Sequence, residues 1–287
     1  MPHWTVDAPA SLDFDAVTAL RVRLIAGSVA VMATGDRPSV VVSDISGRPL
    51  QIGQEDNGTL TIAYDYEKLS WERLLDWLNP LHDTAAVTVT VPADCPVQLG
   101  VVSASAVVCG LSAGASVKGV SGEITLDGVT GDVQAETVSG ALEGRDVDGA
   151  VRFKSVSGGL TLADGALALL EAENVSGQIS ADVTLADNGD VRISTVSGAV
   201  TVRLPADSDA AVRLRSTGGN VRSEFDSLRA ATPYWSHTVS GNVGDGSGSV
   251  SVTSVSGAVT LLRRSQRRTT PRTETPRAEA EMESETQ

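Results

Sequence analysis

The stretch VSGALEGRDVDGAVRFKSVSG, residues 138–158, holds one full copy of a repeat and the start of the next. The tripeptide Val-Ser-Gly begins at Val120, Val138, Val156, Val175, Val196, Val239 and Val255. Val102-Ser-Ala extends the series upstream, and Thr217-Gly-Gly fills the interval between Val196 and Val239. The first intervals are 18 residues long, and most of the later ones are longer. Near-constant spacing of this kind is the signature of a repeat architecture.

A column of apolar residues lies two positions after each repeat glycine: Ile124, Leu142, Leu160, Ile179, Val200, Val221, Val243 and Val259. Another apolar residue often follows two positions later, which is the alternation expected of a strand. The middle of the unit shows the same pattern of a glycine-bearing turn followed by a strand, as in Val129-Thr-Gly-Asp-Val133. Each 18-residue unit therefore predicts two short strands, each entered through a glycine-bearing turn.

Such units cannot bury a face alone, but stacked about 4.8 Å apart they enclose a continuous interior. We therefore predict an all-β fold, a single-chain parallel β-solenoid, with a conventional β-sandwich as the alternative. Right-handed coils are expected because parallel crossovers are right-handed in ordinary sheets. The Val-Ser-Gly valines are expected to point inward, and the repeat serines to hydrogen-bond the local backbone at the turns.

The regions outside the repeat divide the chain further. Residues 1–66 alternate well and predict a β-rich N-terminal region, which is either a set of irregular early turns or a small abutting sheet. Residues 67–86 form a helical insertion, 87–264 the solenoid and 265–287 a disordered tail. The tail contains no Val, Ile, Leu, Phe, Trp or Tyr, so it cannot bury enough surface to fold.

The insertion carries one short amphipathic helix. Trp71, Leu74, Leu75 and Leu78 share one helical face, and Pro80 ends it. The charges over this segment sum to −1, whereas a helix lying in a membrane surface favours a basic polar face. The helix is therefore expected to be a lid over the solenoid rather than a membrane anchor.

Composition limits the partners and the compartment. The formal net charge is −14, which disfavours nucleic acid and anionic lipid surfaces. The chain has no apolar run long enough for a transmembrane helix and begins without a signal-peptide pattern, so a cytoplasmic location is expected. Cys95 and Cys109 are the only cysteines and lie beside apolar residues, so two small buried thiols are expected.

Chemistry-bearing motifs are absent from the sequence. His3, His82 and His237 have no partner at metal-binding spacing, and there is no HExxH, CxxC, GxSxG or phosphate-binding loop. We therefore predict no catalytic residue, no cofactor, no metal and no small-molecule substrate, and a protein that is not an enzyme. The candidate partner surface is aromatic: Trp71, Trp77, Phe225, Tyr234, Trp235 and His237.

The alternating N-terminal strands, the segment from Val87 to Val97 and the iterated Val-Ser-Gly resemble the DUF4097 family of bacterial putative adhesins, over about residues 15–262. The resemblance implies a β-solenoid, often near envelope-stress operons, with no catalytic residues to carry over. It favours a non-enzymatic scaffold or binding protein. The alternative is a structural protein that polymerises end to end, like a bactofilin. In either case a protein partner or self-association is expected.

Overall fold

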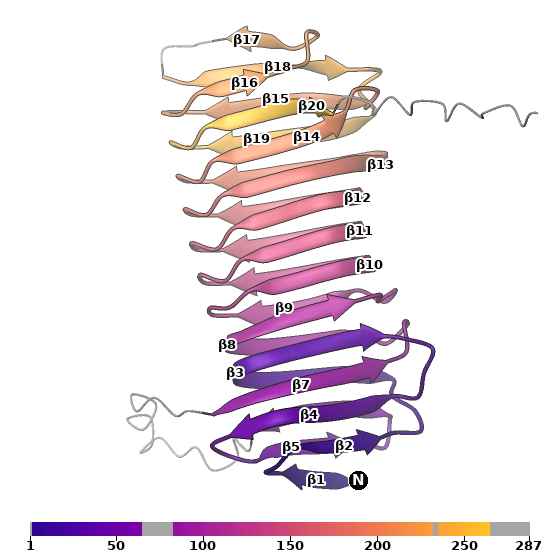
Figure 1. Ribbon diagram of the computed structural model, residues 1–287. Coiled ribbons are helices and arrows are strands. Elements are labelled where there is room, and N and C mark those ends of the chain that lie inside the picture. Colours follow the sequence, from indigo (N-terminus) through magenta and orange to yellow (C-terminus); the bar gives the residue numbers. More distant parts are fainter. Residues whose placement is uncertain (1, 65–82, 232–234, 265–287) are drawn as a thin grey trace, which may run out of the picture.

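A computed structural model of the chain describes residues 2–64, 83–231 and 235–264 (Figure 1). These residues form one 20-stranded sheet wound into a rod, and no helix occurs among them. Nor does any described segment form a helix long and apolar enough to cross a membrane. The expected amphipathic helix with Trp71 and the tail at 265–287 lie outside the described residues.

The middle of the rod is built from β8 (Val97–Cys109), β9 (Ala115–Gly119), β10 (Ile124–Thr137), β11 (Leu142–Ser155), β12 (Leu160–Asn174) and β13 (Ile179–Thr195). They pair in parallel, and Ile124 lies beside Leu142, which lies beside Leu160. These three side chains are buried, so the second apolar column lines the interior as predicted. The parallel stacking of 18-residue coils is confirmed here.

Each coil has two faces joined by two corners. In β10, Ile124 to Asp127 lies on one face and Val133 to Thr137 on the other, because these segments pair with different strands on the preceding side of the rod. One corner turns at Gly128, and the equivalent positions Asp146 and Asp164 also have positive φ. The other corner is the Val-Ser-Gly segment. The interior between the faces is thin, which suits a chain with 3% aromatic residues.

At the C-terminal end, spatial order departs from chain order. The strands are β14 (Val200–Pro205), β15 (Ala210–Ser216), β16 (Val221–Ser223), β19 (Gly248–Ser254) and β20 (Val259–Arg264). β19 lies between β13 and β15, and β20 lies between β14 and β16. The last coil is therefore inserted into the rod, one coil before its end. Regular sequential stacking, as the spacing suggested, is wrong for this part.

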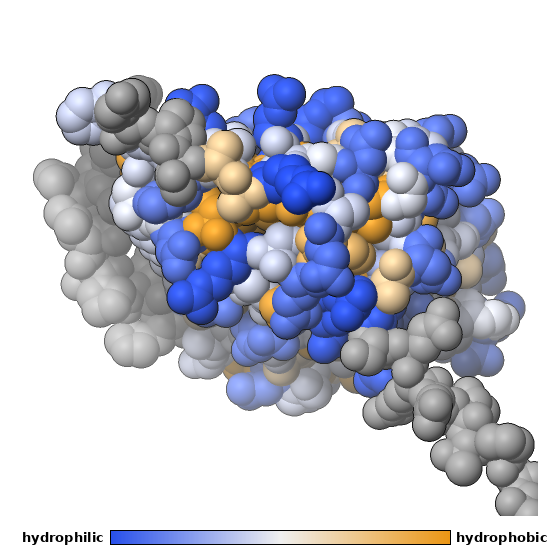
Figure 2. Space-filling model, turned by 90° about the horizontal axis from the view of Figure 1, so that it is seen from above, coloured by the Kyte–Doolittle hydropathy of each residue, from blue (hydrophilic) through white to orange (hydrophobic). Residues whose placement is uncertain are grey.

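The C-terminal end is closed by antiparallel strands. β18 (His237–Val243) pairs antiparallel with β15 and with β17 (Arg229–Ala231). Val239 is buried within β18, so this copy of Val-Ser-Gly does not belong to the corner column. Seen from above, polar side chains surround apolar surface at this end (Figure 2).

A similar insertion occurs at the N-terminal end. The strands are β1 (His3–Val6), β2 (Ala10–Asp13), β3 (Ala19–Ala33), β4 (Ser39–Ser46), β5 (Leu50–Gln54), β6 (Thr59–Tyr64) and β7 (Thr84–Val91). β3 lies parallel between β8 on one side and both β6 and β7 on the other. β1, β2, β4 and β5 complete this end with antiparallel pairs. The N-terminal region is thus joined to the rod through β3, which pairs with strands of both.

Candidate functional site

The Val-Ser-Gly valines point outward, contrary to the inward orientation expected from the sequence. Their side chains are between 41% and 52% exposed at Val102, Val120, Val138, Val156, Val175, Val196 and Val255. The physical reason is that strand alternation continues into the corner. In β10, Ala135 and Thr137 point inward, so Glu136 and Val138 point outward.

At the corners of Val138, Val156, Val175, Val196 and Val255, the residue before the valine is polar and hydrogen-bonds the corner from inside. Thr137 accepts a hydrogen bond from the Gly140 amide at 2.9 Å, and Ser155 accepts one from the Gly158 amide at 2.8 Å. Asn174 instead donates to the carbonyl oxygens of Gly158 and Gly177. This polar column repeats in register, so the sequence carried a signal for it that was not recognised.

The repeat serine and glycine have structural roles. The serine hydroxyls of the corner column donate to the carbonyl of the valine one coil below, as Ser139 does to Val120 at 3.1 Å. This places the serines in the backbone role predicted for them. A Cβ on Gly158 would collide with the carbonyl oxygen of Gly140, so adjacent coils approach too closely for a side chain. The corner at Gly158 therefore requires glycine, and the valine is the apolar residue of the tripeptide that is exposed to solvent.

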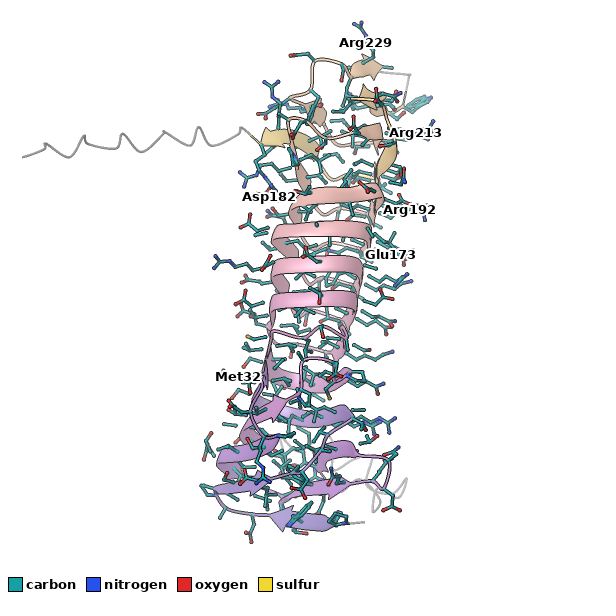
Figure 3. All side chains as sticks on the ribbon, turned by 90° about the vertical axis from the view of Figure 1, so that its right-hand side faces the viewer. Met32, Glu173, Asp182, Arg192, Arg213 and Arg229 are labelled. Atoms are coloured by element: carbon teal, nitrogen blue, oxygen red, sulfur yellow. The ribbon has the colours of Figure 1, made fainter. Side chains whose placement is uncertain are left out.

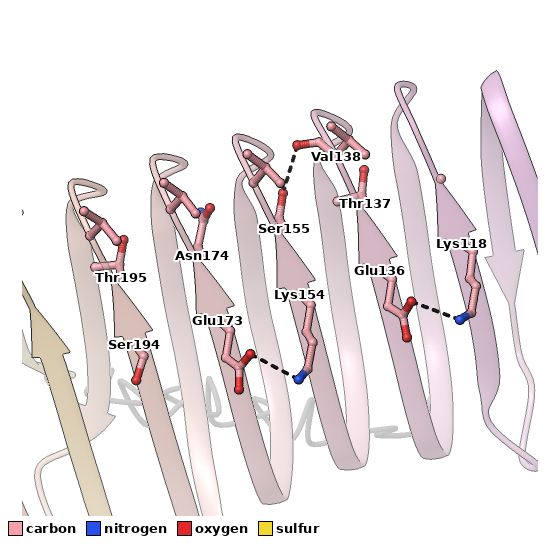
Figure 4. A pocket seen from close by; sticks show the side chains of 14 residues that line it. Lys118, Glu136, Thr137, Val138, Lys154, Ser155, Glu173, Asn174, Ser194 and Thr195 are labelled. Atoms are coloured by element: carbon pink, nitrogen blue, oxygen red, sulfur yellow. Dashed lines mark hydrogen bonds and ion pairs between the residues drawn. The ribbon is translucent and has the colours of Figure 1, made fainter.

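The outward valines line a groove along the rod, called here the valine groove (Figure 4). Its larger part has a volume of about 670 Å³ and extends over the coils from Lys118 to Val196. A smaller part of about 430 Å³ continues it to Arg23 and Val102 and shares Lys118 and Gly119 with the first. The groove is open and shallow, which suits an elongated surface better than an enclosed small molecule.

Charges of alternating sign run beside the valines. Lys118, Glu136, Lys154 and Glu173 occupy the same position in successive coils, two residues before each valine. Lys118 pairs with Glu136 at 2.9 Å, and Lys154 pairs with Glu173 at 3.1 Å. We call these four residues the charge ladder.

The ion pairs within the charge ladder shift the pKa values of Glu136 and Lys154. The hydrogen bond from Lys118 lowers the pKa of Glu136, and the hydrogen bond to Glu173 raises the pKa of Lys154. Both shifts favour the charged forms of Glu136 and Lys154 at neutral pH. A partner in the valine groove meets a fixed pattern of plus, minus, plus and minus along the rod.

A second group of charges fixes the inserted coil. Asp182, on the face of the rod opposite Glu173 and Arg192 (Figure 3), pairs with Arg203 and Arg264. Burial raises the pKa of Asp182, but the hydrogen bonds from the two guanidinium groups outweigh it and leave the pKa below its usual value. This cluster joins β13, β14 and β20, so its role is structural.

The expected aromatic partner surface is not assembled by the described residues. Phe225 is only 7% exposed and packs in the core, so it offers no surface. Trp235 is 85% exposed, and His237 is exposed at the start of β18, where it lies beside Ser216 at the C-terminal end of the rod. Trp71, Trp77 and Tyr234 lie outside the described residues.

Other reactive groups are isolated. Cys95 is buried, and burial together with Asp94 raises its pKa to about 11, so its thiol is unreactive. Cys109 is partly exposed, which departs from the expected pair of buried thiols, and both cysteines are free. Among the described residues no three His, Cys, Asp or Glu side chains come together as a metal site.

The chain belongs to the family described as Toastrack DUF4097, which it matches over residues 18–262. The family assignment made from the sequence is thereby confirmed. A search of curated proteins found no match.

Several solved structures are similar to this chain. One is a putative cell adhesion protein from Clostridium sporogenes, at 12% identity and a TM-score of 0.28, covering 90% of this chain and 100% of that one. A putative lipid binding protein from Parabacteroides distasonis has 12% identity and a TM-score of 0.43, with coverages of 90% and 98%. A putative adhesin from Bacteroides fragilis has 10% identity and a TM-score of 0.36, with the same coverages.

These comparisons contradict the cytoplasmic location expected from the sequence. Matched structures are described as a cell adhesion protein and as adhesins, and such proteins typically act at the cell surface.

Proposed function

We propose that the protein is a non-enzymatic binding scaffold that docks a macromolecular partner along the valine groove. The family assignment and the adhesin-like descriptions of similar structures support a binding or scaffold role. The observation that carries the proposal is the row of outward valines, held in register over successive coils.

The corner itself does not require valine. At the corner after β15, Thr217 takes the valine position, and its amide bonds the Ser254 carbonyl as the Val255 amide bonds that of Thr195. The Gly219 amide still bonds the Ser216 hydroxyl at 3.0 Å, so the corner forms with a polar residue in place of valine. Apolar side chains at the other copies therefore serve something beyond the turn, and contiguous exposed apolar surface marks interaction sites.

End-to-end polymerisation is disfavoured by the ends of the rod. The outermost strands include β1, four residues long, and β17, three exposed residues long. Both pair antiparallel with their neighbours, so the ends do not repeat the parallel coil that a growing rod would extend. Short, exposed edge strands are a device by which proteins prevent edge-to-edge association.

Site-specific photocrosslinking tests the docking surface. A benzoylphenylalanine placed at Val156 in the producing cells is expected to give covalent adducts, whereas one at the exposed Arg145 on the opposite face is not. Because Val156 is half exposed, the larger side chain is compatible with folding. Equal adducts at both positions, or none at Val156, would refute the groove as the docking surface.

A further inference from the structure

The charge ladder and the row of valines are both symmetric about the same midpoint of the rod. Read along the rod it runs Lys118, Glu136, Lys154, Glu173, and read backwards every sign is reversed. The midpoint lies between the coils of Glu136 and Lys154, which is also the midpoint of the six valines from Val102 to Val196. A surface of this kind is complementary to itself in the reversed direction.

We propose that the occupant of the valine groove is a second copy of this chain, running antiparallel and related by a two-fold axis between the coils of Val138 and Val156. The inference rests on the proposed docking function and names its partner. Such an isologous contact, with the same patch on both copies, is the commonest way in which soluble proteins form dimers.

The geometry selects the antiparallel arrangement. A two-fold axis that lies in the interface and crosses the rods at a right angle keeps the ladder of one copy on the same side as the ladder of the other and reverses its direction. Glu136 then faces Lys154 of the second copy, and Lys118 faces Glu173. A two-fold axis parallel to the rods would instead place the ladders on opposite sides, where the charges do not meet.

The apolar part follows the same symmetry. Val138 faces Val156 of the second copy, Val120 faces Val175, and Val102 faces Val196. On the other side of the valines, the serine hydroxyls face one another, and they already bond their own backbone, so no donor is stranded. The charge ladder, the valines of the groove and the adjacent row of serines are thus all matched.

The size of the contact predicts its strength. Six coils at about 4.8 Å span about 25 Å, and a strip about 15 Å wide covers roughly 400 Å² on each copy. This lies at the small end of specific interfaces, so the dimer is expected to be weak and dependent on concentration. Its charges are solvent-accessible at the rim, so added salt is expected to weaken it.

Analytical ultracentrifugation of the full chain, at concentrations up to about 1 mM, tests the proposal. The wild type is expected to shift from monomer to dimer, and no larger species is expected. Replacing Val138 and Val156 together by threonine keeps the β-branched shape but removes apolar contact, and should weaken the dimer at least tenfold. A wild type that stays monomeric throughout, or association that the threonine variant leaves unchanged, would overturn the proposal.

Charge reversal tests the register. E136K alone brings a new ammonium group against Lys154 of the second copy, and K154E alone brings a new carboxylate against Glu136 of the second copy, so each variant should lose dimer at least tenfold. When the two variants are mixed, all four ladder contacts become attractive, and a heterodimer should form. Circular dichroism melting of each variant confirms that it is folded. Failure of the mixture to associate where wild type does would refute the antiparallel register.

The two proposals fail in different ways. Crosslinks from Val156 to another protein, together with a purified chain that stays monomeric, would leave the docking function and remove the second copy. Absence of both crosslinks and dimer would remove both. Crosslinks between two copies of the chain, found only at the groove position, would support both.

Discussion

The middle of the rod and its two ends are built from the same kind of strand but follow different rules. From β8 to β13 each coil lies beside the coil that precedes it in the chain. At the ends, β3 is inserted between strands that come later in the sequence, and β19 with β20 is inserted between strands that come earlier. Antiparallel strands then finish both ends (Figure 1).

The difference shows how a repeat protein stops. A coil that stacked in chain order to the end would leave a long parallel edge with unpaired backbone groups, which templates further pairing. Inserting β20 between β14 and β16 gives it hydrogen-bonding neighbours on both sides and leaves only the short β16 beyond it. The regular middle provides a uniform surface. The irregular ends prevent the coils of one molecule from pairing with those of another.

The largest loss of stability is expected from adding a side chain between the stacked coils in the middle of the rod. Gly158→Ala places a Cβ against the Gly140 carbonyl, where neighbouring backbone cannot yield, and should cost about 3 kcal/mol or more of unfolding free energy. The control is Gly35→Ala near the N-terminal end, where a Cβ meets nothing, with a change within about 0.5 kcal/mol. Urea denaturation measures both, and similar midpoints would show that the coils are not as tightly stacked as the structure has them.

The next largest loss of stability is expected from substitutions in the inserted coil. Leu261 in β20 is fully buried between two coils, so Leu261→Ala should cost about 3 kcal/mol. Val221 in β16 lies beside Val259 of β20 and is only partly buried, so Val221→Ala should cost about 1 kcal/mol. Chain-order stacking would make Val221 the interior residue and Leu261 the terminal one. If denaturation experiments show a larger loss of stability for Val221→Ala than for Leu261→Ala, the coils are stacked in chain order.

Acid should loosen the attachment of the inserted coil. The folded pKa of Asp182 lies below its ordinary value of 3.8, so its stabilisation is present above that value and is lost as pH falls through the folded pKa. Asp182→Asn should cost about 1 kcal/mol at pH 7 and nothing at strongly acidic pH. Melting curves across pH check this. Asp127→Asn, at the equivalent exposed position of β10, should change the unfolding free energy at pH 7 by about 0.5 kcal/mol or less, and a loss as large as that of Asp182→Asn would contradict the role of the cluster.

The smallest effect is expected at the outward corner. Val156→Asp should change the unfolding free energy by about 1 kcal/mol or less, because the side chain is already half in water. Val151→Asp, in the same coil but fully inward, should cost several times more by burying an unpaired carboxylate. A melting temperature that falls as far for Val156→Asp as for Val151→Asp would place the corner valines inside the rod.

Much of the middle was predictable from the sequence. The 18-residue spacing and the buried column at Ile124, Leu142 and Leu160 give strand positions and coil register directly. The candidate site is not predicted from the sequence, because apolar residues such as these valines are usually buried. The polar residue before most of the valines, such as Thr137 before Val138, was the signal for the outward orientation.

By itself, the sequence determined the family, the coil length and the inward column, because these depend on local alternation and on contacts between successive repeats. Only the tertiary structure decided the direction of the valines and the order of the end strands. The valine direction depends on a buried hydroxyl that closes the corner, and the strand order on pairing between residues as distant in the chain as Val200 and Val259. Spacing along a sequence cannot distinguish a coil added at the end of a rod from one inserted within it, because both present the same repeat to their neighbours.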